Sequence, residues 1–188
     1  MITVDHHLHA IAGFDERVAA IAEDSWQQPV PACPGWDVSA LVSHVTTGTA
    51  RMARLLDGDD PDRVAEFIDR HCDGVDGPRA SWRRAFADAR AVLDQTTLDR
   101  EVRLRDRSVP ARSLVAEACC ETLVHTWDLA TAIGADPRLD GVLVDACEDV
   151  FDEFEDAWRN CGAIGLRVTV GDDADAQTRL LARFGRSA

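Results

Sequence analysis

Apolar residues recur every three or four positions along most of this chain, which is the spacing of one face of an α-helix. In the first such stretch Leu8, Ile11, Val18 and Ile21 stand at core spacing. A linker with two prolines interrupts the pattern at residues 25–36, and the pattern then resumes. The periodicity predicts five main helices, at residues 5–24, 37–56, 79–94, 111–133 and 139–160.

Two residues at these boundaries are of types that terminate helices. The Asp37 carboxylate can accept hydrogen bonds from the free N–H groups at the start of the second helix. Gly134 is a natural residue just beyond the end of the fourth helix, because glycine adopts the left-handed backbone conformation without strain. We therefore expect both helices to begin and end close to these positions.

Shorter segments separate the main helices. A turn is expected at residues 58–61, and a short helix to His71 followed by a Gly/Asp loop is expected within residues 62–77. Residues 100–109 alternate apolar residues with arginines, which predicts an extended segment, either a strand or a lid. Residues 163–170 are predicted to be extended, and residues 175–184 to form a short closing helix.

Long helices with apolar stripes and few strands predict an all-α fold, a helix bundle with short peripheral helices and minor extended segments. A chain of 188 residues is long enough for one hydrophobic core and short for two, so residues 1–188 are expected to form a single domain.

The charge and the termini exclude several classes of function. A formal net charge of −14 argues against nucleic acid as a partner, because phosphate binding needs a basic surface. No apolar run is long enough to span a bilayer, and the first residues lack the pattern of a signal peptide, so a cytoplasmic protein is expected. The chain has no lysine and no tyrosine, and its bias toward Ala, Asp, Val and Arg suggests an actinobacterial source.

Six cysteines raise the question of disulfides. None forms a Cys-x-x-Cys pair, and several fall at apolar positions of predicted helices. Reduced and mostly buried thiols are therefore expected at Cys33, Cys72, Cys119, Cys120, Cys147 and Cys161.

The strongest chemical signal is the pair Glu121 and His125. Residues four apart on a helix lie one turn apart on one face, where a carboxylate and an imidazole can close on one metal ion. His44 lies on the apolar face of the second helix and supplies a third ligand type. Two histidines and one glutamate would bind a divalent metal and leave positions open, as in catalytic sites.

Plainer interpretations of these residues remain open. Glu121 and His125 can instead form a solvent-exposed helical ion pair, although Leu123 and Val124 beside them argue for burial. A lone histidine such as His44 is more often a core imidazole, but together with the pair we favour a ligand. Asp128, one turn beyond His125, is expected to support a ligand imidazole by a hydrogen bond, or else to anchor an arginine or a backbone amide.

Other histidines are candidate metal ligands, and one cysteine is a candidate nucleophile. His6, His7 and His9 resemble a metal cluster, but adjacent helical side chains diverge by about 100°, so the run is expected to fray or to face solvent. His71 is expected to be incidental. Cys33 is a candidate nucleophile whose pKa the start of the second helix would lower, but a hydrophobic plug with Trp36 is favoured.

Two motifs together resemble a known family. Pro31-Ala-Cys-Pro-Gly-Trp36-Asp-Val-Ser-Ala-Leu-Val-Ser-His44 and Glu121-Thr-Leu-Val-His125-Thr-Trp-Asp128 look like the metal-binding domain of the mycothiol-dependent maleylpyruvate isomerase family, within the DinB-like metalloenzymes. Residues 177–186 also resemble the ending of a single-domain branch of that family.

The resemblance implies a DinB-like four-helix bundle in which His44, Glu121 and His125 hold a divalent metal, zinc above nickel, manganese or iron. It also implies mycothiol as a co-substrate. The isomerase carries a further C-terminal domain that this chain is expected to lack, so the resemblance supports metal binding more directly than isomerisation of maleylpyruvate.

The expected function is that of a mycothiol-dependent thiol S-transferase or isomerase-like enzyme acting on a small electrophile, because a metal makes a bound thiol acidic. A metal-dependent hydrolase and a non-catalytic metal- or thiol-binding protein are the alternatives. Trp36, Trp127 and the arginines of residues 100–107 are expected to line the pocket, although those arginines also fit a solvated strand edge. An apolar face on the fifth helix is compatible with a homodimer.

Overall fold

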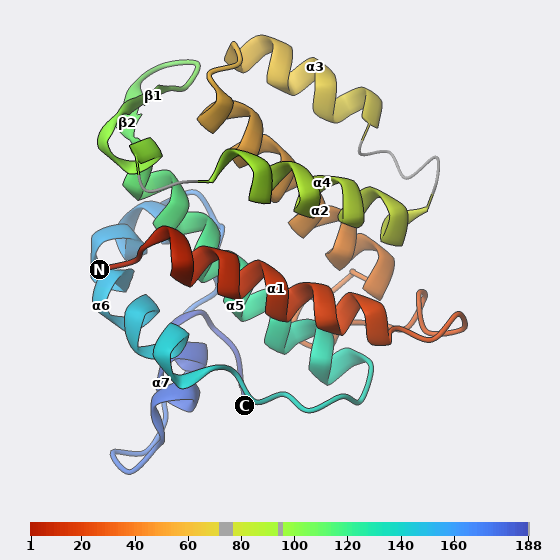
Figure 1. Cartoon of the computed structure of the whole chain (residues 1–188). Helices are drawn as coiled ribbons and strands as arrows, with labels where there is room; N and C mark the ends of the chain where they lie inside the picture. The colour runs from red at the N-terminus through yellow and green to blue at the C-terminus, as the bar shows by residue number, and fades with distance from the viewer. Residues whose placement is uncertain (72–76, 94–95, 188) are drawn as a thin grey trace.

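Four helices lie side by side as a bundle in the computed structural model, which describes residues 1–71, 77–93 and 96–187 (Figure 1). α2 packs against α4 and α5, and α1 packs against α5 and α4. The four helices are α1 (Val4–Ala20), α2 (Val38–Asp57), α4 (Pro78–Val92) and α5 (Ala111–Ala132).

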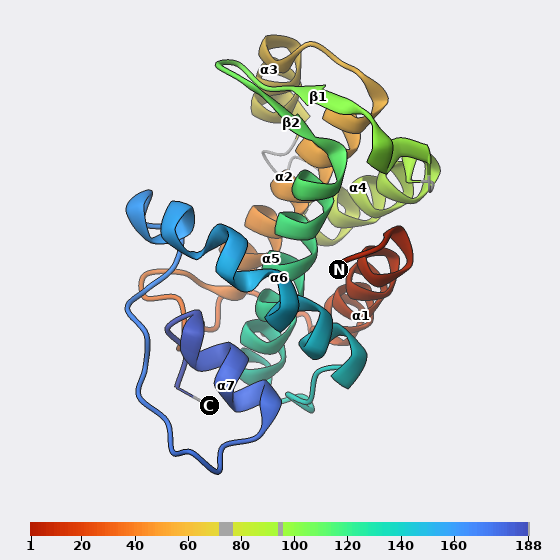
Figure 2. The ribbon, with the colours of Figure 1, turned by 90° about the vertical axis from the view of Figure 1, so that its left-hand side faces the viewer.

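Three further helices surround this bundle. α3 (Pro61–His71) packs on α2, α6 (Gly141–Asn160) packs on α5, and α7 (Ala176–Arg183) packs on α6. In Figure 2, α6 crosses in front of α5 with its first turns near α1, and α7 lies below α6. The predicted all-α bundle with peripheral helices is therefore confirmed.

The only sheet among the described residues is a two-stranded hairpin. β1 (Glu101–Arg103) pairs antiparallel with β2 (Ser108–Pro110), with Val102 opposite Val109, and a 3₁₀ turn (Thr96–Asp99) precedes β1. The prediction of an extended segment at residues 100–109 is confirmed. Residues 163–170 form no strand; they run beside α7, where the Val168 N–H donates to the Ala182 carbonyl over 3.0 Å.

The helix ends follow local chemistry. Asp37 caps α2 as predicted, since its carboxylate accepts from the Ala40 N–H over 2.8 Å. Gly134 follows α5 with φ of +69°, a conformation that favours glycine. The first helix ends at Ala20, four residues earlier than predicted, because Ile21 turns to an extended backbone conformation. Cys72, the Gly/Asp loop after His71 and the predicted end of the third main helix at Asp94 lie outside the described residues.

The histidine-rich start of α1 differs from the prediction. Thr3 and His6 form a reciprocal capping box, in which the Thr3 hydroxyl accepts from the His6 N–H and the His6 ring accepts from the Thr3 N–H. His7 is fully buried, so the expectation that this run frays or faces solvent is wrong for it. The cap fixes the first turn, and the helical period then carries His7 to the core side of α1.

One hydrophobic cluster joins these elements. Trp82 is fully buried in α4, its ring meets Phe14 of α1 edge-on at 4.7 Å, and its indole N–H donates to Asp15 over 2.8 Å. Within the described part of the chain, no helix combines the length and the apolar character needed to cross a membrane.

Candidate metal centre and its cavity

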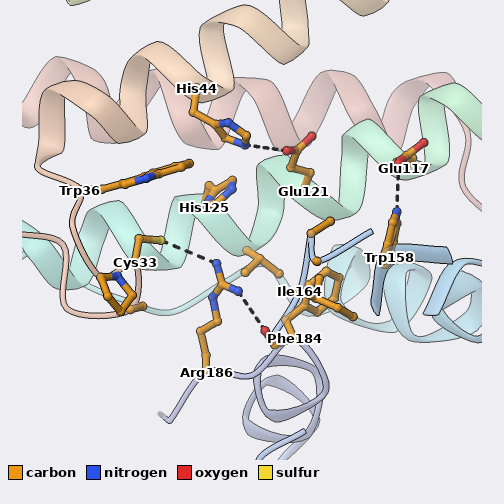
Figure 3. Close-up of a pocket in the computed structure, with 15 residues that line it drawn as sticks. Cys33, Trp36, His44, Glu117, Glu121, His125, Trp158, Ile164, Phe184 and Arg186 are labelled. Carbon is orange, nitrogen blue, oxygen red and sulfur yellow. Dashed lines mark hydrogen bonds and ion pairs between the residues drawn. The ribbon is translucent and has the colours of Figure 1, made fainter. Parts of the chain in front are cut away.

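α2 and α5 bring the three predicted ligands together (Figure 3). The ligand atoms of His44, Glu121 and His125 all lie within 4.8 Å of one another, and His44 Nε2 lies 2.7 Å from Glu121 Oε1. The rings of the two histidines are 5.1 Å apart. Two imidazoles and one carboxylate that converge in this way form the donor set of an open, catalytic type of metal site.

The Glu121 carboxylate is held in the ionised form. Burial by itself would raise the pKa of Glu121, but the hydrogen bond from His44 and the nearby imidazoles and Arg51 outweigh burial and lower that pKa. An ionised Glu121 is the form that binds a cation.

Asp128 lies behind His125, as predicted. Its Oδ2 atom is 2.9 Å from His125 Nδ1, and its side chain is completely buried. Burial opposes ionisation here too, but hydrogen bonds from His125 and Arg186 keep the pKa of Asp128 below its ordinary value. Because Asp128 engages Nδ1, the Nε2 atom of His125 is the one left to face a metal.

Arg186 completes the charge balance around Asp128. The guanidinium reaches Asp128 through Nη2 at 2.8 Å and Nε at 3.3 Å, and Nη1 donates to the Phe184 carbonyl at 2.9 Å. The segment after α7 thus returns to the bundle and places a cation beside a buried anion. Asp128 thus contacts both kinds of partner expected for it, His125 and an arginine, and its support of a metal ligand stays a prediction.

Cys33 also contacts this group, with Sγ 3.5 Å from Asp128 Oδ2 and 3.8 Å from Arg186 Nη2. Burial, and next the negative charge of Asp128, raise the pKa of the Cys33 thiol to about 12. The alternative in which the helix start lowers this pKa is wrong. Cys33 is a neutral thiol in the cavity wall.

A second group of possible ligands, Cys33, His125 and Asp128, is also close enough to hold a metal. It fits a cation less well, because Asp128 is already paired with Arg186 and with His125 Nδ1. Among the described residues, we therefore favour the His44, Glu121 and His125 group as the metal site.

These residues open onto a cavity of about 450 Å³. The Trp36 ring lies in its wall, 4.8 Å from the His44 ring. The cavity is lined by Ala32, Cys33, Pro34, Trp36, His44, Glu117, Glu121, Val124, His125, Trp158, Gly162, Ala163, Ile164, Phe184 and Arg186.

Some residues expected at the pocket lie elsewhere. Trp127 belongs to the hydrophobic core, because it follows His125 by two residues and so points to a different side of α5. None of the arginines in residues 100–107 lines the cavity. Arg103 and Arg105 instead pair with Asp60 and Asp62, and the hairpin that carries them lies at the other end of the bundle from α7 (Figure 2).

Sequence reasoning missed the wall that α6 and α7 supply. Trp158, near the end of α6, donates its indole N–H to Glu117 over 3.0 Å, and Ile164 and Phe184 lie beside it (Figure 3). Arg159 holds the segment that carries Ile164 by donating to the carbonyls of Gly165 and Arg183. Residues 177–186 resemble a family motif, but nothing in their spacing indicates that Arg186 returns to the site.

The remaining thiols agree with the expected reduced state. Cys119, Cys120 and Cys147 are buried and Cys161 is exposed, and none of the described cysteines forms a disulfide.

Comparison with known proteins gives a family and a fold. The model of the mycothiol maleylpyruvate isomerase N-terminal domain family matches residues 7–130, which hold all three metal-ligand candidates. No match was found among curated proteins.

Two solved structures resemble this one. The mycothiol-dependent maleylpyruvate isomerase has a TM-score of 0.58 and 17% sequence identity, and a histidine-to-alanine mutant of such an isomerase has 0.59 and 16%. Each comparison covers 86% of this chain and 75% of the other. At these identities the likeness shows a shared DinB-like helical fold.

Proposed function

Because the chain belongs to the mycothiol maleylpyruvate isomerase N-terminal domain family, we propose that it is a metal-dependent enzyme that joins mycothiol to a small electrophile. It acts as a thiol S-transferase or, by reversible addition, as an isomerase-like catalyst. The observation that carries this proposal is the convergence of His44, Glu121 and His125 at the wall of a cavity large enough for a small substrate.

The donor set suits a divalent cation, with zinc as the first choice and nickel, manganese or iron as alternatives. One carboxylate and two neutral imidazoles would leave a dication with a net positive charge. A cation bound there would lower the pKa of an entering thiol and so supply a thiolate at neutral pH.

The protein's own residues orient this site. Asp128 accepts a hydrogen bond from the Nδ1–H group of His125, which favours one tautomer and fixes the ring orientation of that residue. Arg186 balances the negative charge of Asp128, so this buried carboxylate does not remove the Nδ1 proton from His125. The Trp36 ring lies 4.8 Å from the His44 ring and 6.2 Å from the His125 ring, and it provides an apolar edge to the site.

The pocket wall supplies the place for the electrophile. Val124, Trp158, Ile164 and Phe184 present apolar surface next to the metal-ligand candidates. An electrophile held against this wall would stand beside the thiol, and such positioning contributes strongly to a bimolecular reaction. A cytoplasmic location fits the use of a low-molecular-weight thiol.

The first experiment is to measure the metal content of protein purified without an affinity tag or added metal. We expect about one equivalent in the wild type and a loss of it in His44→Ala, which removes a ligand. His9→Ala is the matched control, because His9 is half-exposed and lies outside the cavity. If neither wild type nor variant binds zinc, nickel, manganese or iron, the proposal fails.

A second experiment separates the classes of activity. Metal-loaded protein is given mycothiol and an electrophile, and thiol consumption is followed against the uncatalysed rate. Faster thiol consumption supports the proposed transferase or isomerase-like activity, whereas ester or amide cleavage without thiol would identify a hydrolase. Saturable metal or thiol binding without any turnover would instead identify a binding protein.

A further inference from the structure

Apart from a metal held by His44, Glu121 and His125, the cavity contains little positive charge for an anionic substrate. Among the described residues that line it, Arg186 is the one with a permanent cation, while Glu117 and Glu121 both carry carboxylates. The remaining lining side chains are the two imidazoles, Cys33, and apolar groups. The character of the electrophile therefore depends on whether Arg186 is available.

Arg186 is fully engaged. Nε and Nη2 donate to Asp128, Nη2 also lies 3.8 Å from the Cys33 sulfur, and Nη1 donates to the Phe184 carbonyl. Only 11% of its side chain is exposed. Its charge is balanced by a completely buried carboxylate, so its guanidinium has no free pair of N–H donors for a substrate carboxylate.

Glu117 adds negative charge at the solvent-exposed rim of the cavity. It stands one turn before Glu121 on the same face of α5, and its carboxylate accepts from the Trp158 indole (Figure 3). Trp158 is in turn fixed by rings on both sides, Phe154 stacked at 5.1 Å and Phe184 at 5.5 Å. The carboxylate is thus held beside the apolar wall.

We infer that the electrophile accepted by this cavity is uncharged and largely apolar, and that Glu117 discriminates against electrophiles that carry a carboxylate. With the thiol on the metal, a dicarboxylate such as maleylpyruvate meets no unpaired cation among the described lining residues, and it meets a like charge at Glu117. Trp36 at one end of the cavity and Trp158 at the other instead offer aromatic surface to a flat apolar molecule (Figure 3). The inference rests on the proposed function only in treating the ligand as an electrophile. The preference for a neutral ligand follows from the residues that line the cavity.

The binding test uses a matched pair of unreactive ketones, 4-phenylbutan-2-one and its para-carboxylate. Each is titrated by calorimetry into purified protein from which a chelator has removed any metal, because a metal would itself bind the carboxylate. We expect the neutral ketone to bind at least about tenfold more tightly. Equal or tighter binding of the carboxylate overturns the inference, and so does a failure of both ketones to bind at millimolar concentration.

Two variants locate the cause. Glu117→Gln keeps an acceptor for the Trp158 indole and removes the charge, so we expect the preference to narrow several-fold. Ile164→Arg adds a free cation to the wall and is expected to raise affinity for the carboxylate. Glu153→Gln removes an exposed carboxylate of α6 outside this cavity and should leave the ratio unchanged. A ratio that Glu117→Gln does not alter would overturn the role of Glu117.

The reactive counterparts test the same preference during turnover. Mycothiol adds to 4-phenylbut-3-en-2-one by forming a bond from sulfur to the β-carbon, while the thiol proton ends on the α-carbon and nothing is released. Rates for this enone and its para-carboxylate are each divided by the uncatalysed rate, and we expect the neutral enone to gain more. If neither reaction is accelerated but the neutral ketone still binds preferentially, the proposed enzyme function fails while the assignment of the cavity holds.

Discussion

His125 and Asp128 form a buried pair in which the imidazole Nδ1 and the carboxylate Oδ2 are 2.9 Å apart. The two residues are three positions apart on α5, so the helix itself sets their approach. Asp128 has no exposed surface and its other contacts are to Arg186 and Cys33. This pair orients the imidazole that belongs to the candidate metal site.

Asp128→Asn should weaken metal binding by about 10- to 100-fold, the usual effect of losing the carboxylate behind a ligand histidine. The amide still fills the space, but it leaves Arg186 without its anion and holds the imidazole less firmly. Competitive titration against a chromophoric chelator measures the affinity, and Asp136→Asn, at a surface carboxylate far from the cavity, is the control. Wild-type affinity in Asp128→Asn would show that the pair does not support the metal site.

Arg186→Gln should lower the free energy of unfolding by about 3 kcal/mol, because it leaves the Asp128 charge buried without its cation. Chemical denaturation gives the value. Arg138→Gln removes a surface arginine whose partner, Asp136, is also solvent-accessible, and should leave the denaturation midpoint unchanged. Equal midpoints for Arg186→Gln and wild type would contradict the energetic role given to the C-terminal segment.

Gly48→Ala should stabilise the protein by about 0.5–1 kcal/mol, because alanine is the better residue in a helix interior. A Cβ atom at this position of α2 would lie 3.6 Å from Glu121 Oε2, an ordinary contact that leaves the carboxylate in place. Thermal denaturation and metal content are the measurements. Gly13→Ala in α1, where a Cβ meets nothing within 4 Å, shows the helix effect alone. Loss of metal in Gly48→Ala but not in Gly13→Ala would show that Glu121 needs the open space.

The helices and the metal-ligand candidates were predictable because both depend on short-range spacing. Apolar periodicity located the bundle helices, and the four-residue separation of Glu121 and His125 placed them on one face whatever the rest of the fold. Asp128 followed from the same spacing. To place His44 near this pair, the prediction needed only that α2 and α5 pack together, as neighbouring helices of a bundle do.

The far wall of the cavity was not predictable in this way. Arg186 is 58 positions from Asp128, and its approach depends on the path of the chain after α7. Glu117 and Trp158 meet because α6 packs on α5, a long-range arrangement that periodicity does not specify. The alternative of a lowered Cys33 pKa fails for the same reason, because the nearby helix start is visible in the sequence, whereas the burial of the thiol and the Asp128 charge beside it are not.

His7 leads to a prediction about acid stability. The imidazole is fully buried in α1, and neither ring nitrogen has a hydrogen-bond partner. Burial lowers its pKa from 6.5 to about 4, because the charged form is poorly solvated in the core. Between these two values the unfolded chain binds a proton at this site and the folded chain does not.

His7 therefore does not lower the free energy of unfolding above pH 6.5. As the pH falls from 6.5 toward 4, proton binding to the unfolded chain lowers that free energy progressively. The loss at this one site amounts to about 3 kcal/mol across that window. His7→Leu should remove this component, so its free energy of unfolding should fall less than that of the wild type between pH 7 and pH 4. Urea denaturation at a series of pH values measures both curves.

His9→Gln provides the matched comparison, because His9 is on the same helix but more than half of its side chain is exposed. Its curve should follow that of the wild type, because this substitution leaves the buried His7 imidazole in place. Parallel curves for wild type and His7→Leu would mean that His7 is protonated in the folded protein at acid pH. In that case the core would have to open around His7, or supply it with an acceptor, before the protein unfolds.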